Sequence, residues 1–215
     1  MSDFETRSVA EPADSLAEAP TRKRPKAGER RVQILQALGA MLEQPGGERI
    51  TTAALAARLG VSEAALYRHF ASKAQMFEGL IEFIEQSVFS LISQITTAGS
   101  GDGRQRVASI VAMLLQFGEK NPGMTRVMVG DALVFENDRL QQRMNLFFDK
   151  IEATLRQTLR ELATAGGSIT PGVDAQVQAS VLTSFAVGRM QRFARSGFKR
   201  LPSEHLDASL ATMLQ

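Results

Sequence analysis

The feature that most limits what this chain can fold into is the stretch TTAALAARLGVSEAALYRHFASK, residues 51–73. Apolar residues recur in it at helical spacing on both sides of a glycine, and they are Leu55, Ala56, Leu59, Leu66 and Phe70. Gly60 permits the positive φ of a tight turn, and Ser62 can cap the helix that follows. The stretch therefore predicts two short helices that cross closely at a turn, a helix-turn-helix.

The outer face of the second predicted helix carries side chains that suit DNA. Arg68 is the expected bidentate contact to a guanine edge, Ala64 the contact to a thymine methyl, and Tyr67 the contact to a phosphate or a thymine. Glu63 either accepts a hydrogen bond from a cytosine amino group or only favours the helix N-terminus. The other expected DNA-binding residues, mostly phosphate contacts, are Thr51, Thr52, Ser62, His69 and Lys73. Thr51 could instead serve only as a cap, and an ordinary hairpin with a solvated polar face is the alternative to the whole motif.

Charge is unevenly distributed along the 215 residues, although the net charge is only +2. Residues 1–21 sum to −4, residues 22–73 to +6 and residues 74–215 to zero. Positive charge therefore collects at the predicted helix-turn-helix. This is the electrostatic footprint of phosphate binding, and it predicts an affinity that falls steeply with salt.

The chain before the motif divides into an acidic and a basic part. Residues 1–21 have no sustained apolar period and are expected to be disordered. The basic run that follows, up to Arg31, is either a solvated linker or an arm that contacts phosphates or the minor groove. A first helix is expected over residues 29–44. The predicted domains are a tail with a basic arm (1–28), a DNA-binding domain (29–75) and a dimerisation and partner-binding domain (76–215).

Beyond the motif, apolar stripes of helical period predict only helices. A capping box at Ser72 and Gln75 opens a long helix that runs to about residue 97. Further helices are expected over residues 107–121, 124–135 (short and mostly buried), 139–162, 177–193 and 203–214, with loops at 98–103 and 166–172. The predicted fold is all-α, with about nine helices that form a three-helix headpiece and a helical effector module.

Two long helices near the C-terminus carry more apolar surface than one subunit needs. They predict a four-helix bundle formed with the same two helices of a second subunit, related by a twofold axis. Because one helix-turn-helix reads only a few base pairs, a homodimer on a palindrome is expected, and several dimers per site remain open. A monomer on an asymmetric site is the alternative.

The string LGVSEAALYRHFASK resembles the recognition helix and the start of the next helix in TetR-type regulators. Tyr67, His69 and Lys73 fall where that family repeatedly uses these residue types. The resemblance implies the TetR fold and DNA binding, and it covers the first third of the chain.

The second module resembles the nucleoid occlusion factors, a group within the TetR type. The resemblance is carried by GLIEFIEQS (79–87), FGEKNPGMTR (117–126), ALVFENDRLQQRMNLFFDKIEATLRQTLRE (132–161) and RFARSGFK (192–199). It implies a DNA-bound dimer on the nucleoid that also binds the tubulin-like division protein FtsZ and inhibits septum assembly. The residues that the resemblance assigns to the FtsZ groove are Phe83, Met113, Lys120 and Asn121.

Other interpretations remain open for that groove. Phe83 is expected to be half exposed, and it could equally be a ring at the edge of the core. Lys120 and Asn121 directly precede a proline, which marks the end of a helix. A cation and an asparagine are favoured at a helix C-terminus whether or not a partner binds there. Leu91, Gln116 and Lys120 depart from the arginine, glycine and arginine of the group, so the detail of the partner contact could differ.

Enzyme chemistry is not expected. The chain has no cysteine, and its only histidines are His69 and His205. No histidine lies near the acidic pairs in sequence, so solvated helix faces explain Glu82, Glu85, Glu136 and Asp138 better than metal ligation does. Neither a metal nor a cofactor is therefore predicted. No apolar run is long enough for a membrane span or a signal peptide, and a cytoplasmic protein is expected.

The alternative function is a ligand-responsive repressor with the same headpiece. Its pocket would be mostly apolar and would lie in the second module. The residues that could line such a pocket, or simply form the core, are Met113, Phe117, Met144, Phe148, Phe185 and Met190.

Overall fold

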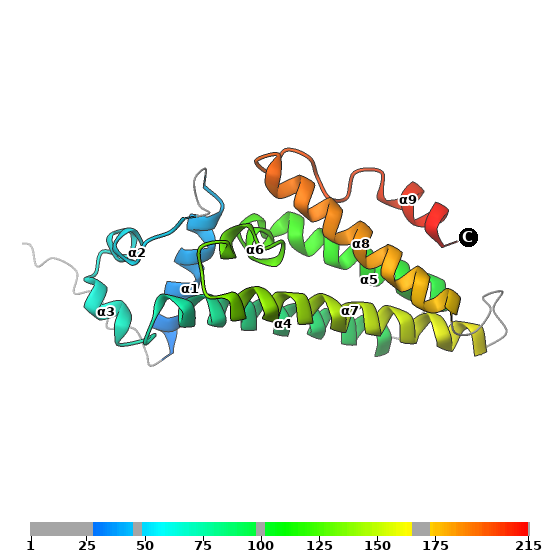
Figure 1. The fold of residues 1–215 in the computed structure, drawn as a ribbon, viewed down its shortest axis with the longest axis horizontal. Coiled ribbons are helices and arrows are strands. Elements are labelled where there is room, and N and C mark those ends of the chain that lie inside the picture. Colours follow the sequence, from blue (N-terminus) through cyan, green and yellow to red (C-terminus); the bar gives the residue numbers. More distant parts are fainter. Residues whose placement is uncertain (1–27, 45–48, 98–101, 165–172, 215) are drawn as a thin grey trace, which may run out of the picture.

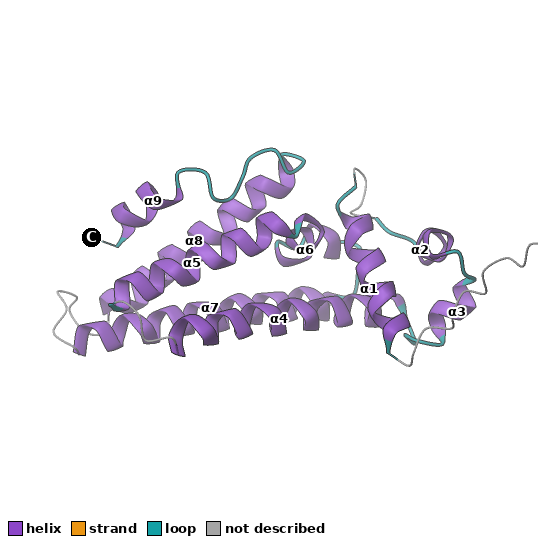
Figure 2. Cartoon of the chain, turned by 180° about the vertical axis from the view of Figure 1, so that it is seen from behind, coloured by secondary structure: helices purple, strands orange, loops and turns teal. Residues whose placement is uncertain are grey.

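A computed structural model describes residues 28–44, 49–97, 102–164 and 173–214. Within these ranges the chain is all-α, as predicted, and no strand occurs (Figure 2). The helices are α1 (Glu29–Leu42), α2 (Thr52–Leu59), α3 (Glu63–Tyr67), α4 (Lys73–Thr97), α5 (Gly103–Lys120), α6 (Pro122–Met128), α7 (Asp138–Thr164), α8 (Val173–Arg195) and α9 (Leu206–Met213), with a short 3₁₀ turn η1 (Asp131–Leu133). The predicted disordered tail, most of the basic arm and the loop at 166–172 lie outside the described residues.

The molecule is elongated, with α1, α2 and α3 at one end (Figure 1). We call these three helices the headpiece and α4–α9 the effector module. In the effector module α4 and α7 lie side by side and run away from the headpiece, whereas α5 and α8 run back toward it. The helix α9 returns along α5 and α8, where Arg104 Nη1 donates to the carbonyl of Leu214 (2.7 Å).

The helix α4 joins the headpiece to the effector module. Its start follows the predicted capping box, because the backbone N–H of Gln75 donates to Ser72 Oγ (3.2 Å). The reciprocal contact differs from the prediction, since the Gln75 side chain accepts from the N–H of Ala71 (2.8 Å). Ile81, Ile84 and Val88 are fully buried along its inward stripe. Burial of each such side chain contributes about 1.5–3 kcal/mol, so packing rather than propensity holds this long helix in place.

Ion pairs tie α4 to α7 on the partly exposed side of their contact. Arg143 donates through Nε to Glu85 Oε1 (3.1 Å) and through Nη2 to Glu85 Oε2 (2.6 Å). This bidentate hydrogen bond with Glu85 raises the pKa of Arg143. One turn earlier Arg139 pairs with Glu78 at 2.6 Å. Glu85 therefore serves a structural contact between two helices.

The segment after α6 differs from the prediction. A mostly buried helix was expected over residues 124–135, but α6 ends at Met128, and Val134 and Phe135 are exposed. Gly130 explains the break: its φ of 85° is left-handed, and its N–H closes the turn onto the carbonyl of Val127 (3.1 Å). The chain then forms η1 and a short loop before α7 begins.

Both faces of α8 carry apolar residues. Val177 and Val181 lie on the exposed side of α8, whereas its buried face is made by alanines and by Leu182 and Met190. Among the described residues, no helix combines the length and apolar character needed to cross a membrane.

A close backbone contact joins α1 to α6. A Cβ added at Gly123 would lie 2.1 Å from the carbonyl oxygen of Gly39. Only a glycine at position 123 lets the two helices approach this far. The contact fixes the headpiece against the effector module at a point far in sequence from α4.

Candidate nucleic-acid interface

The local geometry of α2 and α3 is that of a helix-turn-helix. Thr51 caps α2, its Oγ1 accepting from the N–H of Ala54 (3.1 Å), and Ser62 caps α3, its Oγ accepting from the N–H of Ala65 (3.3 Å). Gly60 ends α2 with a φ of 63°, and its N–H reaches the carbonyls of the last turn. Leu66 is fully buried in the angle between the helices. The capping and turn residues thus act as their sequence pattern predicts.

The exposed face of this unit brings together the predicted base-reading residues. Glu63 and Ala64 open α3, Tyr67 ends it, and Arg68 is its C-cap. All four side chains are exposed, as is His69 directly after them. The helix is short, five residues, and it stands at the outer end of the molecule (Figure 1). An exposed helix with an arginine and an aromatic ring on its open side has the form that enters a major groove.

Two of the predicted DNA-binding residues contact each other. Thr52 Oγ1 donates to Glu63 Oε2 at 2.5 Å, which links the first turn of α2 to the first residue of α3. This bond gives Glu63 a role within the protein, because it connects the N-terminal ends of α2 and α3. It is a third possibility beside the two that the sequence left open, a cytosine contact and a helix N-terminal charge.

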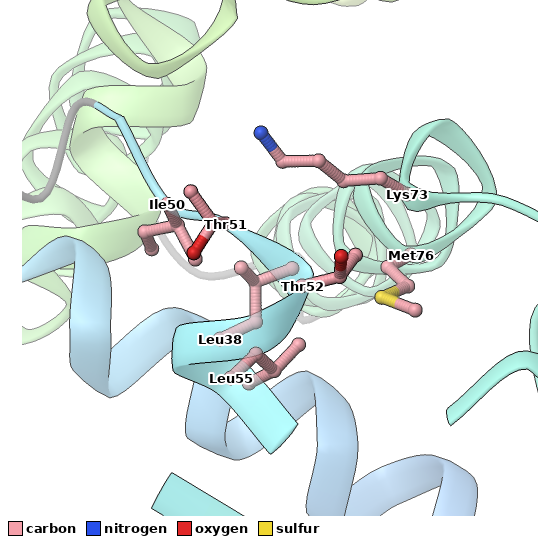
Figure 3. A pocket seen from close by; sticks show the side chains of 7 residues that line it. All are labelled: Leu38, Ile50, Thr51, Thr52, Leu55, Lys73 and Met76. Atoms are coloured by element: carbon pink, nitrogen blue, oxygen red, sulfur yellow. The ribbon is translucent and has the colours of Figure 1, made fainter. Parts of the chain in front are cut away.

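Lys73, at the start of α4, is placed beside the N-terminus of α2. It lies close to Thr51 and Thr52 (Figure 3), so the structure brings three predicted phosphate contacts together. The first N–H groups of a helix lack intrahelical acceptors and favour an anion. The Lys73 ammonium also forms an ion pair with Glu136, from the loop before α7.

Arg31 is a further functional candidate, because the structure gives it contacts that the sequence interpretation did not propose. It was grouped with the basic arm, yet its Nη1 donates to the carbonyl of His69 (2.9 Å), and its guanidinium lies 4.1 Å from the centre of the Phe70 ring. Both contacts hold the turn that follows α3. The signal was present in the sequence, because Arg31 lies one turn before Leu35 and two before Leu38 on the inward stripe of α1.

The predicted partner residues lie on α4 and α5, which pack against each other in opposite directions. Phe83 is 48% exposed, as the sequence predicted. Met113 is partly buried against the core, and Lys120 is exposed at the end of α5. Asn121 is the C-cap, and its Nδ2 donates to the carbonyl of Phe117 (2.7 Å). The structure gives Asn121 a capping role, and it leaves Phe83 and Lys120 accessible near the headpiece-proximal end of the effector module.

Two of the four carboxylates that could suggest metal ligation form ion pairs instead. Glu85 pairs with Arg143, and Glu136 pairs with Lys73. Among the residues that the structure describes, no group of three or more histidine, aspartate or glutamate side chains is placed to hold a metal ion.

Two family models match the chain. The model described as "Bacterial regulatory proteins, tetR family" matches residues 34–80, which include the helix-turn-helix. The model described as "Tetracyclin repressor-like, C-terminal domain" matches residues 102–215. The two matches lie on either side of the middle of α4, and together they cover most of the described chain.

Similar solved structures support the same architecture. FadR from Bacillus subtilis, solved in complex with stearoyl-CoA, superposes with a TM-score of 0.70 at 15% identity, over 86% of this chain and 97% of that one. PfmR from Thermus thermophilus gives 0.69 at 20% identity, over 85% and 97%. At such identities the likeness concerns the fold alone.

Curated relatives match both modules at once. The nucleoid occlusion factor SlmA of Idiomarina loihiensis is 53% identical over 186 residues, 86% of this chain and 94% of that protein. The SlmA protein of Vibrio cholerae is 51% identical over 179 residues, 83% and 90% of the two chains. An identity this high across headpiece and effector module is far above that of the structural neighbours. The chain therefore belongs to the SlmA family of TetR-type proteins.

Proposed function

We propose that this protein is a nucleoid occlusion factor. It binds palindromic chromosomal sites as a homodimer, binds FtsZ and inhibits septum assembly over the nucleoid, and it resides in the cytoplasm on the nucleoid. The observation that carries the proposal is the extent of the likeness to SlmA proteins, 86% of this chain and 94% of the relative, since it includes the effector module and not only the headpiece. A DNA-binding unit at residues 29–75 and a partner-binding unit at 76–215 follow from it.

The base-reading role falls to the exposed face of α3. Arg68 reads a guanine edge, Ala64 a thymine methyl, and Tyr67 a thymine or a phosphate. Arg68→Ala is expected to weaken binding to the cognate palindrome far more than binding to random DNA, whereas Lys73→Ala weakens both alike. Equal losses on the two DNAs for Arg68→Ala would remove it from the base readers.

The homodimer is supported by the exposed stripe of α8. Val177, Val181, Ser184 and Gly188 recur at helical spacing on that side, and a Cβ at Gly188 would meet nothing within 4 Å. A smooth stripe of small and apolar residues suits a second copy of itself about a twofold axis. Val181→Glu is expected to yield monomers in analytical ultracentrifugation. The control is Leu201→Glu, because Leu201 is 47% exposed against 48% for Val181 but lies off the stripe.

FtsZ is proposed to bind where α4 and α5 meet. Phe83 offers a half-exposed ring, and Lys120 and Asn121 offer a cation and a capped helix end at the same end of the module. Phe83→Ala is expected to weaken FtsZ binding and to leave DNA binding unchanged. Unchanged FtsZ binding, or a loss of DNA binding without a loss of FtsZ binding, would mean that FtsZ binds elsewhere on the protein.

The deciding experiment recovers chromosome-bound fragments from cells and then sediments the protein with FtsZ, with and without the recovered duplex. Scattered sites and co-sedimentation with FtsZ support nucleoid occlusion. A ligand-responsive repressor, the weaker alternative, would instead occupy sites next to promoters and release them when a small apolar compound is added. Failure to prefer any duplex over bulk competitor at low salt would overturn both functions.

A further inference from the structure

The loop between α6 and α7 reaches across to the headpiece. Glu136 forms an ion pair with Lys73, and the guanidinium of Arg49, just before α2, lies 5.0 Å from the centre of the Phe135 ring. The Glu136 side chain is only 9% exposed, whereas that of Lys73 is 30% exposed. The carboxylate is therefore largely enclosed by the contact, and the ammonium still faces solvent.

Ala132 and Leu133 anchor the start of this connection in the core, and the part that follows them, Val134 to Asn137, is held by few other contacts. The N–H of Glu136 closes a turn onto the carbonyl of Leu133 (3.0 Å), and the N–H of Leu133 onto that of Gly130 (2.9 Å). Val134 and Phe135 project from it and are exposed. Since their apolar surface contributes little burial, the ion pair and the stacked guanidinium are the main attachments of the loop to the headpiece.

Lys73 thus stands between two anions once DNA is bound. One is the Glu136 carboxylate, fixed to the effector module, and the other is a backbone phosphate held by Lys73 beside the N-terminus of α2 at Thr51 and Thr52 (Figure 3). An ammonium that is already neutralised by a carboxylate attracts a phosphate less strongly and releases fewer counterions when it binds one.

We propose that Glu136 is an intramolecular competitor for the DNA phosphate at Lys73. It lowers the affinity of the headpiece for DNA of any sequence alike. By reciprocity, a phosphate that takes Lys73 from Glu136 loosens the loop from Val134 to Asn137. The inference rests on the DNA binding proposed above, and it assigns a DNA-linked change to a segment of the effector module.

The test is Glu136→Gln in the full chain, titrated with a short random-sequence duplex over a range of salt. The glutamine keeps the size and an acceptor oxygen but removes the charge. Each additional effective phosphate contact raises affinity by up to about eightfold at ~0.1 M salt and steepens the slope of log K against log salt by up to about 0.9, so a dimer with one new contact in each subunit gains up to about twice that slope. Lys73→Gln is expected to weaken binding, and the double variant should bind like Lys73→Gln alone, because the competition needs both partners.

The matched control is Glu85→Gln. Glu85 is also a partly buried carboxylate paired with an arginine of α7, but it lies twelve residues along α4 from Lys73, about 18 Å. At that distance an exposed charge is largely screened at ~0.1 M salt, so DNA affinity should stay within about twofold of the parent.

Hydrogen exchange provides the second measurement. Bound duplex should speed exchange of the amides from Val134 to Asn137 in the parent protein, and in Glu136→Gln this exchange should already be fast without DNA. Unchanged or weaker duplex binding by a folded Glu136→Gln protein would overturn the inference and make Glu136 a positioning residue for Lys73. Absence of binding by parent and variant alike would overturn the proposed DNA binding as well.

Discussion

Gly123→Ala tests whether the contact between α1 and α6 fixes the headpiece. The added Cβ would lie 2.1 Å from the carbonyl oxygen of Gly39 and 3.1 Å from Glu43 Cγ. Contacts of this kind below 3.0 Å are essentially never seen, so the two helices must separate by about 1 Å. The near atom is backbone and cannot rotate away as a side chain does.

The expected cost follows from overpacking. Forcing an extra methyl group into a packed contact costs about 1–3 kcal/mol. For a chain of this length each kcal/mol lowers Tm by about 2–4 °C, so Gly123→Ala should melt roughly 2–12 °C below the parent. The measurement is thermal unfolding at equal protein concentration, because the melting of a dimer depends on concentration.

Gly39→Ala is the matched control. Gly39 lies in the same contact, but a Cβ added to it would meet nothing within 4 Å. The helix should gain about 0.5–1 kcal/mol from the better propensity of alanine, which raises Tm by about 1–4 °C. Truncation of Glu43 should not rescue Gly123→Ala, since the carbonyl oxygen remains. A Gly123→Ala protein that melts at or above the parent temperature would refute this account of the junction.

Three further changes test other contacts. Thr51→Ala removes the cap of α2 and should cost about 1 kcal/mol, measured by urea unfolding; Thr51→Ser should restore it, and equal stability of all three proteins would contradict the cap. Arg31→Ala should weaken DNA binding while Tm changes little, because the turn after α3 loses its hydrogen bond and ring contact; unchanged affinity in a fluorescence titration would contradict this role. Phe147→Ala should cost about 3–5 kcal/mol, because Phe147 is fully buried and packs edge-on against Phe89; a loss under 1 kcal/mol in urea unfolding would show that the core closes over the gap.

Local patterns in the sequence were sufficient for the helices and their caps. Ser62, Gly60 and Thr51 act within three or four residues of themselves, so their spacing alone predicted the turn of the helix-turn-helix. The half-exposed Phe83 also followed from its angle on α4 relative to Ile84. The all-α fold needed no more than the recurring apolar stripes.

Contacts between distant segments could not be predicted in this way. The pairing of Lys73 with Glu136 joins residues 63 positions apart, and neither residue carries a local sign of the other. The same holds for Gly123 and Gly39, whose contact depends on how α6 turns back toward α1. The error over residues 124–135 has a local cause, since Gly130 was not weighed as a helix breaker.

The contacts between the headpiece and the effector module matter because α4, which joins them, is long, so a small tilt at one end displaces the other end. The 25 residues of α4 extend over about 37 Å, and the proposed dimer stripe lies along α8, which packs against α5 and α7. A tilt of about 5° at one end of a rod this long moves the other end by roughly 3 Å, close to the ~3.4 Å rise of one base pair. The contacts that resist such a tilt are Gly123 against Gly39, Gly79 against the Leu35 side chain, and Glu136 with Lys73. Each of them therefore influences which half-site spacing a dimer accepts, and a loosened contact should broaden the accepted spacing before it unfolds the protein.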